Sequence, residues 1–444
     1  MNEKVDLGSR IENSSLSKDM AGNKVTVAGW LQDTRNLGGI AFLLLRDRSG
    51  LVQVTCLKKK LGDEVFAKLT AVPRESVLAV TGEIKPNQQV SSGFEILPES
   101  YEVIAEAQTP LPMGIVDKVG VELDTRLNNR FLDLRKSQVL AIFKLRELLI
   151  RGMREYLVSQ RFLEVTTSKI VAAGAEGGST LFPIDYFGKK AYLAQSPQLY
   201  KQMLMGAGLD RIYELAPAYR AEQSDTVRHI AEFASLDIEM SFIRSEDDVM
   251  ELLQGLLVHS LDCVLRDGKQ YLDELGVEVA PPKTPFPRIT FADATQVLAE
   301  AGVEVKGDLD TESEKKLGEL MLAKHGAEMY FITKFPSELK KATFYAMRDS
   351  ENPDLTNYFD LDYRGEELVS GGQREHRLNI LINQMEDIGY DPKDFEFYLQ
   401  AFRYGMPTHG GFGLGIERVL HMMLRLPNIR ECVLFPRDMY RVVP

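Results

Sequence analysis

The sequence predicts an α+β protein with a small β-barrel at its amino end, followed by a larger antiparallel sheet flanked by helices. Three observations support this prediction. Short segments with period-two alternation crowd residues 22–104, and a long segment with an apolar period near 3.6 covers residues 138–160. Beyond that segment, strands and helices mix without a repeated βαβ unit. The length of 444 residues exceeds what one core usually organises, so at least two domains are expected.

Composition places the chain among soluble globular proteins, with an apolar fraction of 44% and a charged fraction of 27%. Cys56, Cys263 and Cys432 are widely spaced and odd in number. They fit neither a disulfide framework nor a zinc-binding sequence pattern, and they indicate a reducing compartment. The polar start lacks the apolar segment of a signal peptide, and no apolar run approaches the roughly 20 residues that span a bilayer. We expect a cytoplasmic protein with no membrane partner.

The net charge of −12 argues against a general nucleic-acid binder, because phosphate recognition usually leaves a basic footprint. It does not exclude a folded RNA that binds one local basic face.

The amino-terminal segment reads as five strands with one short helix at residues 64–69 between the third and fourth strands. Five strands and a helix within about 85 residues predict a barrel of the OB type, a fold that often binds oligonucleotides. We assign this domain to residues 1–105. Its strands are expected at residues 24–30, 40–46, 51–56, 77–83 and 94–98.

Residues 106–137 are polar and turn-rich, which predicts a connector or hinge. A second domain then covers residues 138–444, beginning with the long helix. A small helical insertion is expected near residues 300–330, where residues 308–328 carry a helical pattern.

The segment 409–438 carries the strongest chemical signal. It reads as a tight glycine strand-turn at residues 410–415, a helix opened by Glu417 and Arg418, and a second short strand at residues 432–435. Glycines remove the Cβ atoms where a backbone must lie close to a planar ligand. An arginine beside them can stack on a base or pair with phosphate. The alternative is a glycine hairpin that merely precedes a core helix.

The segment 213–240 reads as a strand, a polar loop at residues 223–227 and a returning strand that begins with Arg228 and His229. Arg220 and Glu222 alternate with Ala221, so we expect both to point to one face of the first strand. Arginines beside a covering loop are typical of a triphosphate site. The alternative is a surface hairpin with ordinary ion pairs.

Two further strings supply cations. Gln195, Ser196, Gln198 and Lys201 gather at the expected start of a helix, where anions bind readily. Arg374 follows what reads as a glycine turn after Ser370. Alternatively, Lys201 is a solvated helix lysine.

Acidic residues form the last group. Glu176 lies in a glycine-rich loop, and Asp360 and Glu367 flank a predicted hairpin. Hard oxygen ligands suit Mg²⁺. Acidic residues in loops and hairpins are also commonly just solvated.

The segments 213–240 and 409–438 resemble motifs 2 and 3 of the class II aminoacyl-tRNA synthetases. The strings Q-S-P-Q-L-Y-K at residues 195–201 and S-G-G-Q-R-E-H at residues 370–376 resemble the aspartyl-tRNA synthetases, closest to the archaeal and eukaryotic type. The resemblance runs from about residue 23 to the end of the chain. It implies an OB-fold anticodon-binding barrel, a class II catalytic domain and ATP-dependent charging of tRNA with aspartate.

The resemblance also implies roles for individual residues in nucleotide binding. Arg220 contacts the ATP α-phosphate and the substrate carboxylate, and Glu222 helps to fix the adenine side. Phe233 stacks on adenine, with Arg418 on its other face. The implied catalytic residues are Arg220, Glu222 and Arg418, and the other implied ATP-binding residues are Arg228, His229, Phe233, Glu367 and Gly415.

For aspartate, the resemblance implies that Lys201 and Arg374 grip the side-chain carboxylate. Glu176 meets the ammonium group, with Asp237 nearby. The full implied aspartate set is Glu176, Gln198, Lys201, Arg220, Asp237, Ser370 and Arg374. Mg²⁺ is implied on Asp360, Glu367 and Ser370.

In the barrel, the positions that hold anticodon bases in the family match Arg35, Phe42, Gln53 and Glu95. An aromatic ring with amide and carboxylate neighbours can stack a splayed base and read its edge. Phe42 is alternatively a core residue of the barrel. A homodimer is also implied, although Ser168 stands where motif 1 normally has proline, which leaves the detail of the dimer contact open.

Three rival functions remain. An asparaginyl-tRNA synthetase shares the architecture, but Lys201 argues against it. The barrel argues against a tRNA-independent synthetase-like ligase, and the complete ATP set argues against a catalytically silent RNA-binding relative. Specificity is open between tRNA-Asp alone and tRNA-Asp with tRNA-Asn. Gln32 lacks the bulk of an aromatic that would exclude one base, and the loop at residues 86–90 matches no assignable pattern, so we favour the relaxed form. That form requires a partner amidotransferase.

Overall fold

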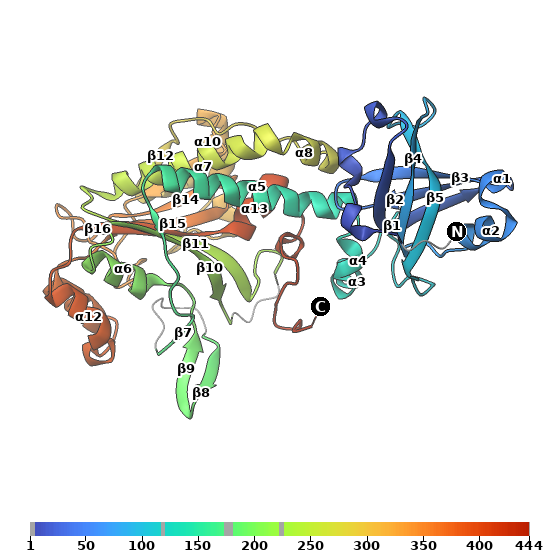
Figure 1. Cartoon of the computed structure of the whole chain (residues 1–444). Helices are drawn as coiled ribbons and strands as arrows, with labels where there is room; N and C mark the ends of the chain where they lie inside the picture. The colour runs from blue at the N-terminus through green and yellow to red at the C-terminus, as the bar shows by residue number, and fades with distance from the viewer. Residues whose placement is uncertain (1–4, 117–119, 173–180, 222–225, 444) are drawn as a thin grey trace. The chain divides into compact units, whose positions relative to one another are not determined.

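The computed structural model describes residues 5–116, 120–172, 181–221 and 226–443 (Figure 1). The chain divides into two compact units, Met1–Val121 and Glu122–Pro444. Of the helices in these described ranges, none combines the length and the apolar character needed to cross a membrane.

The first unit is a closed barrel with strand order β1-β2-β3-β5-β4, which confirms the predicted five-stranded barrel. Strand β1 is longer than expected because it pairs with β4 up to Trp30 and with β2 from Trp30 onward. Gly29 permits this corner, since a Cβ there would lie 2.2 Å from the Arg46 carbonyl oxygen. The barrel strands are β1 (Lys24–Asn36), β2 (Ile40–Arg46), β3 (Leu51–Leu57), β4 (Val77–Pro86) and β5 (Phe94–Ala105), with helices α1 (Lys58–Leu61) and α2 (Asp63–Thr70).

The second unit is built on an eight-stranded sheet of order β12-β13-β14-β15-β16-β11-β10-β6. Its pairs are antiparallel except β12–β13 and β10–β6, which confirms the predicted α+β class. The segment between β6 and β10 forms a separate three-stranded sheet of order β7-β9-β8. The strands are β6 (Leu163–Glu164), β7 (Ile170–Val171), β8 (Pro183–Tyr186), β9 (Lys189–Leu193), β10 (Arg211–Tyr219), β11 (Glu232–Ser241), β12 (Arg288–Thr290), β13 (Met329–Thr333), β14 (Tyr358–Tyr363), β15 (Glu367–Arg374) and β16 (His409–Gly415).

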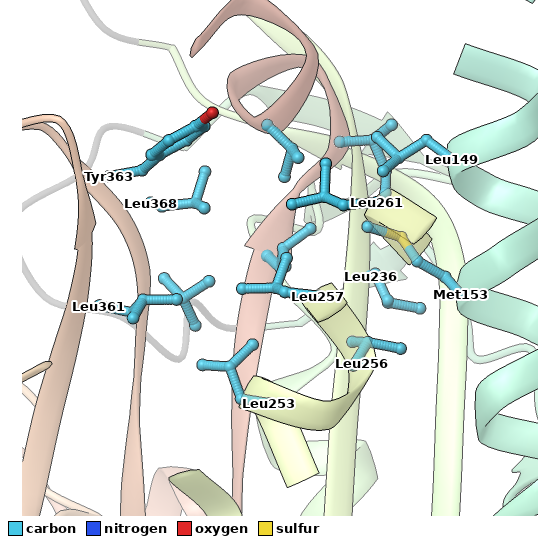
Figure 2. Close-up of a cluster of buried hydrophobic side chains, with 14 of the residues drawn as sticks. Leu149, Met153, Leu236, Leu253, Leu256, Leu257, Leu261, Leu361, Tyr363 and Leu368 are labelled. Atoms are coloured by element: carbon cyan, nitrogen blue, oxygen red, sulfur yellow. The ribbon is translucent and has the colours of Figure 1, made fainter. Parts of the chain in front are cut away.

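Three helices cover one face of the large sheet, and the hydrophobic core lies between this face and the helices. Figure 2 shows leucines of α5 and α7 packing toward Leu236 of β11 and Leu361 of β14. Hydrogen bonds of Glu417 link α13 to α5 and β11. Its carboxylate accepts one hydrogen bond from Arg146 of α5 at 3.0 Å and one from the Ala234 backbone N–H at 2.9 Å. The covering helices are α5 (Ser137–Ser159), α7 (Glu246–Asp267) and α13 (Ile416–Leu424).

The predicted long helix at residues 138–160 is confirmed as α5, and the helical piece at residues 308–328 contains α10, which starts with a capping box between Asp310 and Ser313. The remaining helices are α3 (Leu123–Asn128), α4 (Arg130–Asp133), α6 (Gln198–Gly206), α8 (Lys269–Leu275), α9 (Phe291–Glu300), α10 (Thr311–His325), α11 (Leu378–Glu386) and α12 (Glu396–Arg403). Short 3-10 helices occupy Leu7–Ser9, Asn13–Ser15, Lys18–Met20, Pro392–Phe395 and Ile429–Cys432.

The structure differs from the sequence prediction at the connector and near the carboxyl end. The second half of residues 106–137 forms α3 and α4 within the second unit, and Arg130 of α4 is 1% exposed. Its guanidinium donates to the carbonyls of Glu431, Val433 and Leu434 at 2.9–3.1 Å. The strand predicted at residues 432–435 is therefore wrong, because Arg130 takes up the carbonyls that a sheet partner would need.

The glycine-rich segments are also not turns. Residues 410–415 lie in β16 and the glycines after Ser370 lie in β15, so both predicted glycine turns are wrong. At Gly411 a glycine is needed because the backbone and a side chain of the neighbouring strand β11 fill the space beside it. A Cβ on Gly411 would lie 2.0 Å from the Ile238 carbonyl oxygen and 2.3 Å from Glu239 Oε2.

We expect Gly411→Ala to lower the free energy of unfolding by about 3 kcal/mol, because β11 and β16 must separate to admit the methyl group. Gly413→Ala is the matched control, since its Cβ would approach nothing closer than Asp237 Oδ1 at 3.3 Å. Urea unfolding of both variants measures the difference. Equal losses in the two variants would show that the close approach at Gly411 carries no particular weight.

Candidate active site

The candidate site lies on the sheet face opposite α5 and α7. Leu236 and Ile238 of β11 enter the helix-covered core, so the alternate residues Asp237 and Glu239 point to the other face. On β14 the same alternation separates Leu361 from Asp360. Asp360 pairs across the strands with Ser370 of β15. Acidic and hydroxyl side chains from three strands therefore share one surface.

Two buried cations meet on that surface. Lys201 of α6 is 3% exposed, and its Nζ lies 3.2 Å from Asp237 Oδ1 and 3.4 Å from Glu239 Oε2. Arg374, 1% exposed, donates from Nε to Glu239 Oε1 at 3.2 Å and from Nη2 to the Gly411 carbonyl at 2.8 Å. Burial alone would lower the pKa of Arg374, but Glu239 and two neighbouring tyrosines raise it above its usual value. The alternative of a solvated Lys201 is wrong.

Glu239 was missed by the sequence reasoning, although it bridges the two cations and is fully buried. The available signal was its position two residues after Asp237, which puts both carboxylates on one strand face. Asp237 is further oriented by the Ser235 hydroxyl, which donates to Oδ2 at 2.6 Å. The floor of the site thus carries two cations and two carboxylates.

Gln198 begins α6, which follows β9 and a short linker as the sequence predicted. Its amide donates to Gln202 Oε1 at 3.0 Å, and Gln202 lies 2.9 Å from His409 Nε2. The other ring nitrogen of His409 lies 2.9 Å from the Pro407 carbonyl, so Nδ1 donates there and Nε2 accepts from Gln202. Burial lowers the pKa of His409 to about 4, and the ring is neutral near pH 7.

This histidine predicts an acid-dependent loss of stability. Its folded pKa of about 4 lies below the unfolded value of about 6.5, so the unfolded chain binds the proton more readily. Proton binding by His409 in the unfolded chain therefore lowers the free energy of unfolding. The loss is negligible above about pH 6.5 and reaches about 3 kcal/mol by pH 4. His409→Gln should remove this slope. The measurement is urea unfolding of both proteins from pH 7 to pH 4.5, and parallel pH profiles would contradict the prediction.

The residues of the candidate nucleotide site lie where β10 ends, β11 begins and β16 ends. Arg220 directly follows β10, and its guanidinium carbon lies 5.3 Å from the centre of the Phe233 ring. Gly415 caps α13, and a Cβ there would lie 3.8 Å from Arg418 and 4.0 Å from Phe233. The structure thus brings Arg220, Phe233, Gly415 and Arg418 together. Arg418 Nη1 also donates to the Glu367 carbonyl at 2.9 Å.

Arg228 and His229 lie before β11, which begins only at Glu232, so the prediction that they open the returning strand is wrong. Arg228 instead reaches Glu366 Oε2 at 3.3 Å, and His229 Nδ1 lies 2.6 Å from the Thr226 hydroxyl. Those polar partners hold the segment outside the sheet ladder. Glu176 and Glu222 lie outside the described residues.

Asp360, Glu367 and Ser370 lie on the paired strands β14 and β15, as predicted for a hairpin. Asp360 Oδ2 is 2.9 Å from Lys340 Nζ, while its buried Oδ1 makes no hydrogen bond. Burial raises the pKa of Asp360 to about 6, with Lys340 opposing and Glu367 adding to the rise. An unsatisfied carboxylate oxygen beside a second carboxylate and a hydroxyl is a donor set that fits a hard divalent cation.

Glu314 of α10 was also missed by the sequence reasoning. Burial and the nearby Glu367 raise its pKa to about 7, against the opposing effect of Arg228. Helix α10 approaches the β14–β15 turn closely because Gly318 and Gly365 face each other, and a Cβ on Gly318 would lie 2.6 Å from the Gly365 nitrogen. No sequence signal connected this helix with the site, since the contact depends on tertiary packing.

In the first unit, the predicted anticodon residues share the outer face of the barrel. Ala41, Leu43 and Leu45 fill the core, while Phe42 is only half-buried, so the core alternative for Phe42 is wrong. Arg35 is exposed and pairs with Phe42 across β1 and β2. The other two predicted anticodon residues, Gln53 and Glu95, are hydrogen-bonded to each other. Glu95 Oε2 accepts hydrogen bonds from Gln53 at 3.1 Å, Thr55 at 2.5 Å and Asn87 at 3.0 Å.

Comparison with protein families gives two matches that divide the chain. Residues 25–104 match the OB-fold nucleic acid binding domain, and residues 122–439 match the tRNA synthetases class II (D, K and N).

Similar proteins cover nearly the whole chain. The aspartate–tRNA(Asp) ligase of Pyrococcus abyssi is 49% identical over 97% of this chain and 99% of its own length. The aspartate–tRNA(Asp/Asn) ligase of Methanopyrus kandleri is 47% identical over 97% and 98%. Among solved structures, asparaginyl-tRNA synthetase from Pyrococcus horikoshii, complexed with asparaginyl-adenylate, aligns with a TM-score of 0.91 and 33% identity over 98% of this chain and 99% of its own. The two buried cations on one sheet face, the cluster of Arg220, Phe233 and Arg418, and the five-stranded barrel are consistent with these matches. The chain belongs to the class II aminoacyl-tRNA synthetases of the D, K and N group, which are ATP-using ligases.

Proposed function

We propose that the protein activates L-aspartate with ATP and transfers it to the 3′ end of tRNA. In the first step the α-carboxylate of aspartate attacks the ATP α-phosphate in line, which gives aspartyl-adenylate and releases pyrophosphate. In the second step the terminal ribose hydroxyl of tRNA attacks the adenylate carbonyl and releases AMP. No side chain forms a covalent intermediate, so positioning and charge neutralisation supply the acceleration.

The observation that carries this proposal is the buried pair Lys201 and Arg374. Both cations form ion pairs with Glu239, at 3.4 Å from Lys201 and 3.2 Å from Arg374. The substrate ammonium would take the Asp237 carboxylate, with Glu176 as a second partner, and Lys201 would then turn to the side-chain carboxylate of aspartate. Gln198 and Ser370 would complete the pocket. Lys201 and Arg374 carry two positive charges but share the single carboxylate of Glu239, so a substrate carboxylate would complete the charge balance. An asparagine amide would leave that balance incomplete, which costs several kcal/mol.

ATP would lie across the cluster at the ends of β10, β11 and β16. Phe233 and Arg418 would hold adenine between them. Both lie within 4.0 Å of a Cβ built on Gly415, and the glycine would leave room for the ring. Arg220 would neutralise charge on the α-phosphate and orient the attacking carboxylate. Arg228, His229, Glu222 and Glu367 would serve the remaining nucleotide groups.

We propose Asp360, Glu367 and Ser370 as the residues that hold Mg²⁺, because the free Oδ1 of Asp360 needs a cationic partner. The bound ion would offset negative charge on the phosphates. Removal of divalent metal with a chelator should therefore abolish pyrophosphate exchange.

We further propose that residues 1–105 bind the anticodon and residues 138–444 carry activation, in a cytoplasmic homodimer. Since α3 and α4 belong to the second unit, the hinge would shorten from residues 106–137 to residues 106–121. Gln32, which accepts a hydrogen bond from Arg46 at 3.0 Å, lacks the bulk of an aromatic side chain that would exclude one base. This residue type is the reason that we propose charging of both tRNA-Asp and tRNA-Asn, with an amidotransferase to convert the mischarged product.

The test is charging of tRNA-Asp and tRNA-Asn transcripts with labelled aspartate under matched conditions. Comparable rates on both would support relaxed specificity, whereas aspartylation of tRNA-Asp alone would mean a strict enzyme. Pyrophosphate exchange without charging of either tRNA would point to a tRNA-independent ligase. Exchange driven by asparagine in preference to aspartate would overturn the substrate assignment and favour the asparaginyl relative.

Phe42→Ala should lower kcat/KM for tRNA charging by about 10- to 100-fold, because stacking of one base on an aromatic ring contributes about 1–3 kcal/mol. Pyrophosphate exchange should remain unchanged, since that reaction needs no anticodon contact. Leu51→Ala, an exposed apolar residue of the same barrel, is the control. Equal charging by the wild type and Phe42→Ala would remove Phe42 from the anticodon site.

A further inference from the structure

Three side chains with metal-ligand chemistry meet between α5 and α7, on the helical side of the sheet. They are Glu155 of α5 and His259 and Cys263 of α7, and their ligand atoms all lie within 4.8 Å of one another. Within the described parts of the chain, no other trio of histidine, cysteine and acidic side chains is this compact. The proposed reaction uses none of these residues.

The two helices are built to bring these side chains together. His259 and Cys263 are four residues apart, so they lie on one face of α7. Gly152 lets that face approach α5, because a Cβ there would lie 2.8 Å from the Ser260 Cα and 3.2 Å from Cys263 Sγ. Gly255 does the same from α7, since its Cβ would lie 2.0 Å from the Tyr156 hydroxyl.

The distances suit a tetrahedral ion. Zinc bonds of about 2.0–2.3 Å at tetrahedral angles place neighbouring ligand atoms about 3.3–3.6 Å apart. Glu155 Oε2 lies 3.7 Å from His259 Nε2 and 3.6 Å from Cys263 Sγ. Two edges of the tetrahedron therefore need shifts of only a few tenths of an ångström.

One ligand atom has no hydrogen-bond partner, and another has only weak ones. His259 Nε2 is shielded from solvent and makes no hydrogen bond, while its ring is oriented by a tilted contact with Tyr156 at 5.8 Å. Cys263 Sγ makes two hydrogen bonds of the weak sulfur type, donating to Glu155 at 3.6 Å and accepting from Arg266 at 3.6 Å. Glu155 is exposed, which leaves a route from solvent.

Two cations flank the trio and must be considered. Arg151 Nε lies 3.8 Å from Glu155 Oε1, and Arg266 pairs mainly with Asp267 at 2.9 Å. The Arg266 side chain is 62% exposed and can turn away when an ion enters. The Arg151 side chain is 40% exposed and also pairs with Asp267, which can keep it when Glu155 binds the ion. A carboxylate and a thiolate together then balance the charge of a divalent ion.

We propose that Glu155, His259 and Cys263 form a binding site for a divalent cation of borderline softness, with Zn²⁺ as the ion that this donor set fits. Water completes the fourth position, and the thiol proton passes to solvent when the ion binds. The thiolate excludes Mg²⁺ as the preferred occupant. The ion clamps α5 to α7 and thereby stiffens the layer that supports the sheet.

The experiment is a Co²⁺ titration of the full-length, chelator-treated protein in buffer that contains excess Mg²⁺. A thiolate–cobalt charge-transfer band in the near ultraviolet should grow and saturate at one equivalent, and Zn²⁺ should displace it. Cys263→Ser should lose the band, and His259→Gln should weaken binding at least ~10-fold. Cys56→Ser, a change in the other unit, should keep the band.

A second readout guards against misfolded variants. Zn²⁺ should raise the unfolding temperature of the wild type but not that of Glu155→Gln, a conservative change at an exposed position. The absence of a charge-transfer band in the wild type at stoichiometric Co²⁺ would overturn the proposal. A band of equal strength in Cys263→Ser, or equal stabilisation of Glu155→Gln by Zn²⁺, would do the same.

Discussion

Arg220→Ala is expected to abolish aspartate-dependent ATP–pyrophosphate exchange, with a loss of about 10³-fold or more in kcat. Arg220 directly follows β10, with its guanidinium carbon 5.3 Å from the centre of the Phe233 ring. It is the cation proposed for the junction between ATP and aspartate. Its guanidinium would neutralise the α-phosphate while holding the attacking carboxylate. Removing it should therefore weaken the transition state more than the ground state.

The control for this variant is Arg244→Ala, which removes an arginine that precedes α7 and whose side chain is 84% exposed. It should retain wild-type exchange. Circular dichroism and urea unfolding should show that Arg220→Ala keeps its fold, because Arg220 lies beyond the end of its strand and not within the core. Near-normal exchange in a folded Arg220→Ala protein would refute the assignment of this residue and of the nucleotide site built around it.

Lys201→Met is expected to lower kcat/KM for aspartate in pyrophosphate exchange by about 10²- to 10³-fold. Methionine has nearly the length of lysine, so packing around α6 is largely preserved. The variant leaves Glu239 buried with Arg374 as its remaining cation, and it removes the Lys201 ammonium that lies 3.2 Å from the buried Asp237 carboxylate. The same loss of a buried partner should lower the free energy of unfolding by about 3–5 kcal/mol.

The discriminating readout for Lys201→Met is the ratio of kcat/KM values for aspartate and asparagine. A structural role alone would lower both values together, whereas a contact with the substrate carboxylate would lower the aspartate value selectively and narrow the ratio. Lys269→Ala, which removes a lysine with a 76% exposed side chain on α8, should leave the ratio unchanged. An unchanged ratio in folded Lys201→Met would mean that Lys201 does not select the substrate.

Much of this arrangement was readable from the chain because it depends on local pattern. The alternation of Ala41, Leu43 and Leu45 with outward residues located the barrel strands, and the apolar period of α5 located its helix. The string at residues 195–201 placed Lys201 at a helix start after a strand. Because these patterns express which face of one element is buried, they need no knowledge of its partners.

The failures share a different physical origin. The strand expected at residues 432–435 does not form, because Arg130, some 300 residues away in sequence, donates hydrogen bonds to the backbone carbonyls of this segment. The glycines of β15 and β16 looked like turns because glycine serves equally where a chain bends and where another strand or side chain comes close. Only the tertiary contacts at Gly411 distinguish the two uses.

The sequence by itself determined the fold class, the two-unit order and the residue types at the site, because local periodicity and short strings of polar residues carry that information. The tertiary structure alone decided that Glu239 bridges Lys201 and Arg374, that Glu314 joins the acidic group, and that Glu155 meets His259 and Cys263. Each of these groupings joins elements distant in sequence, and their pairing is set by the packing of whole sheets and helices. No local pattern records that packing.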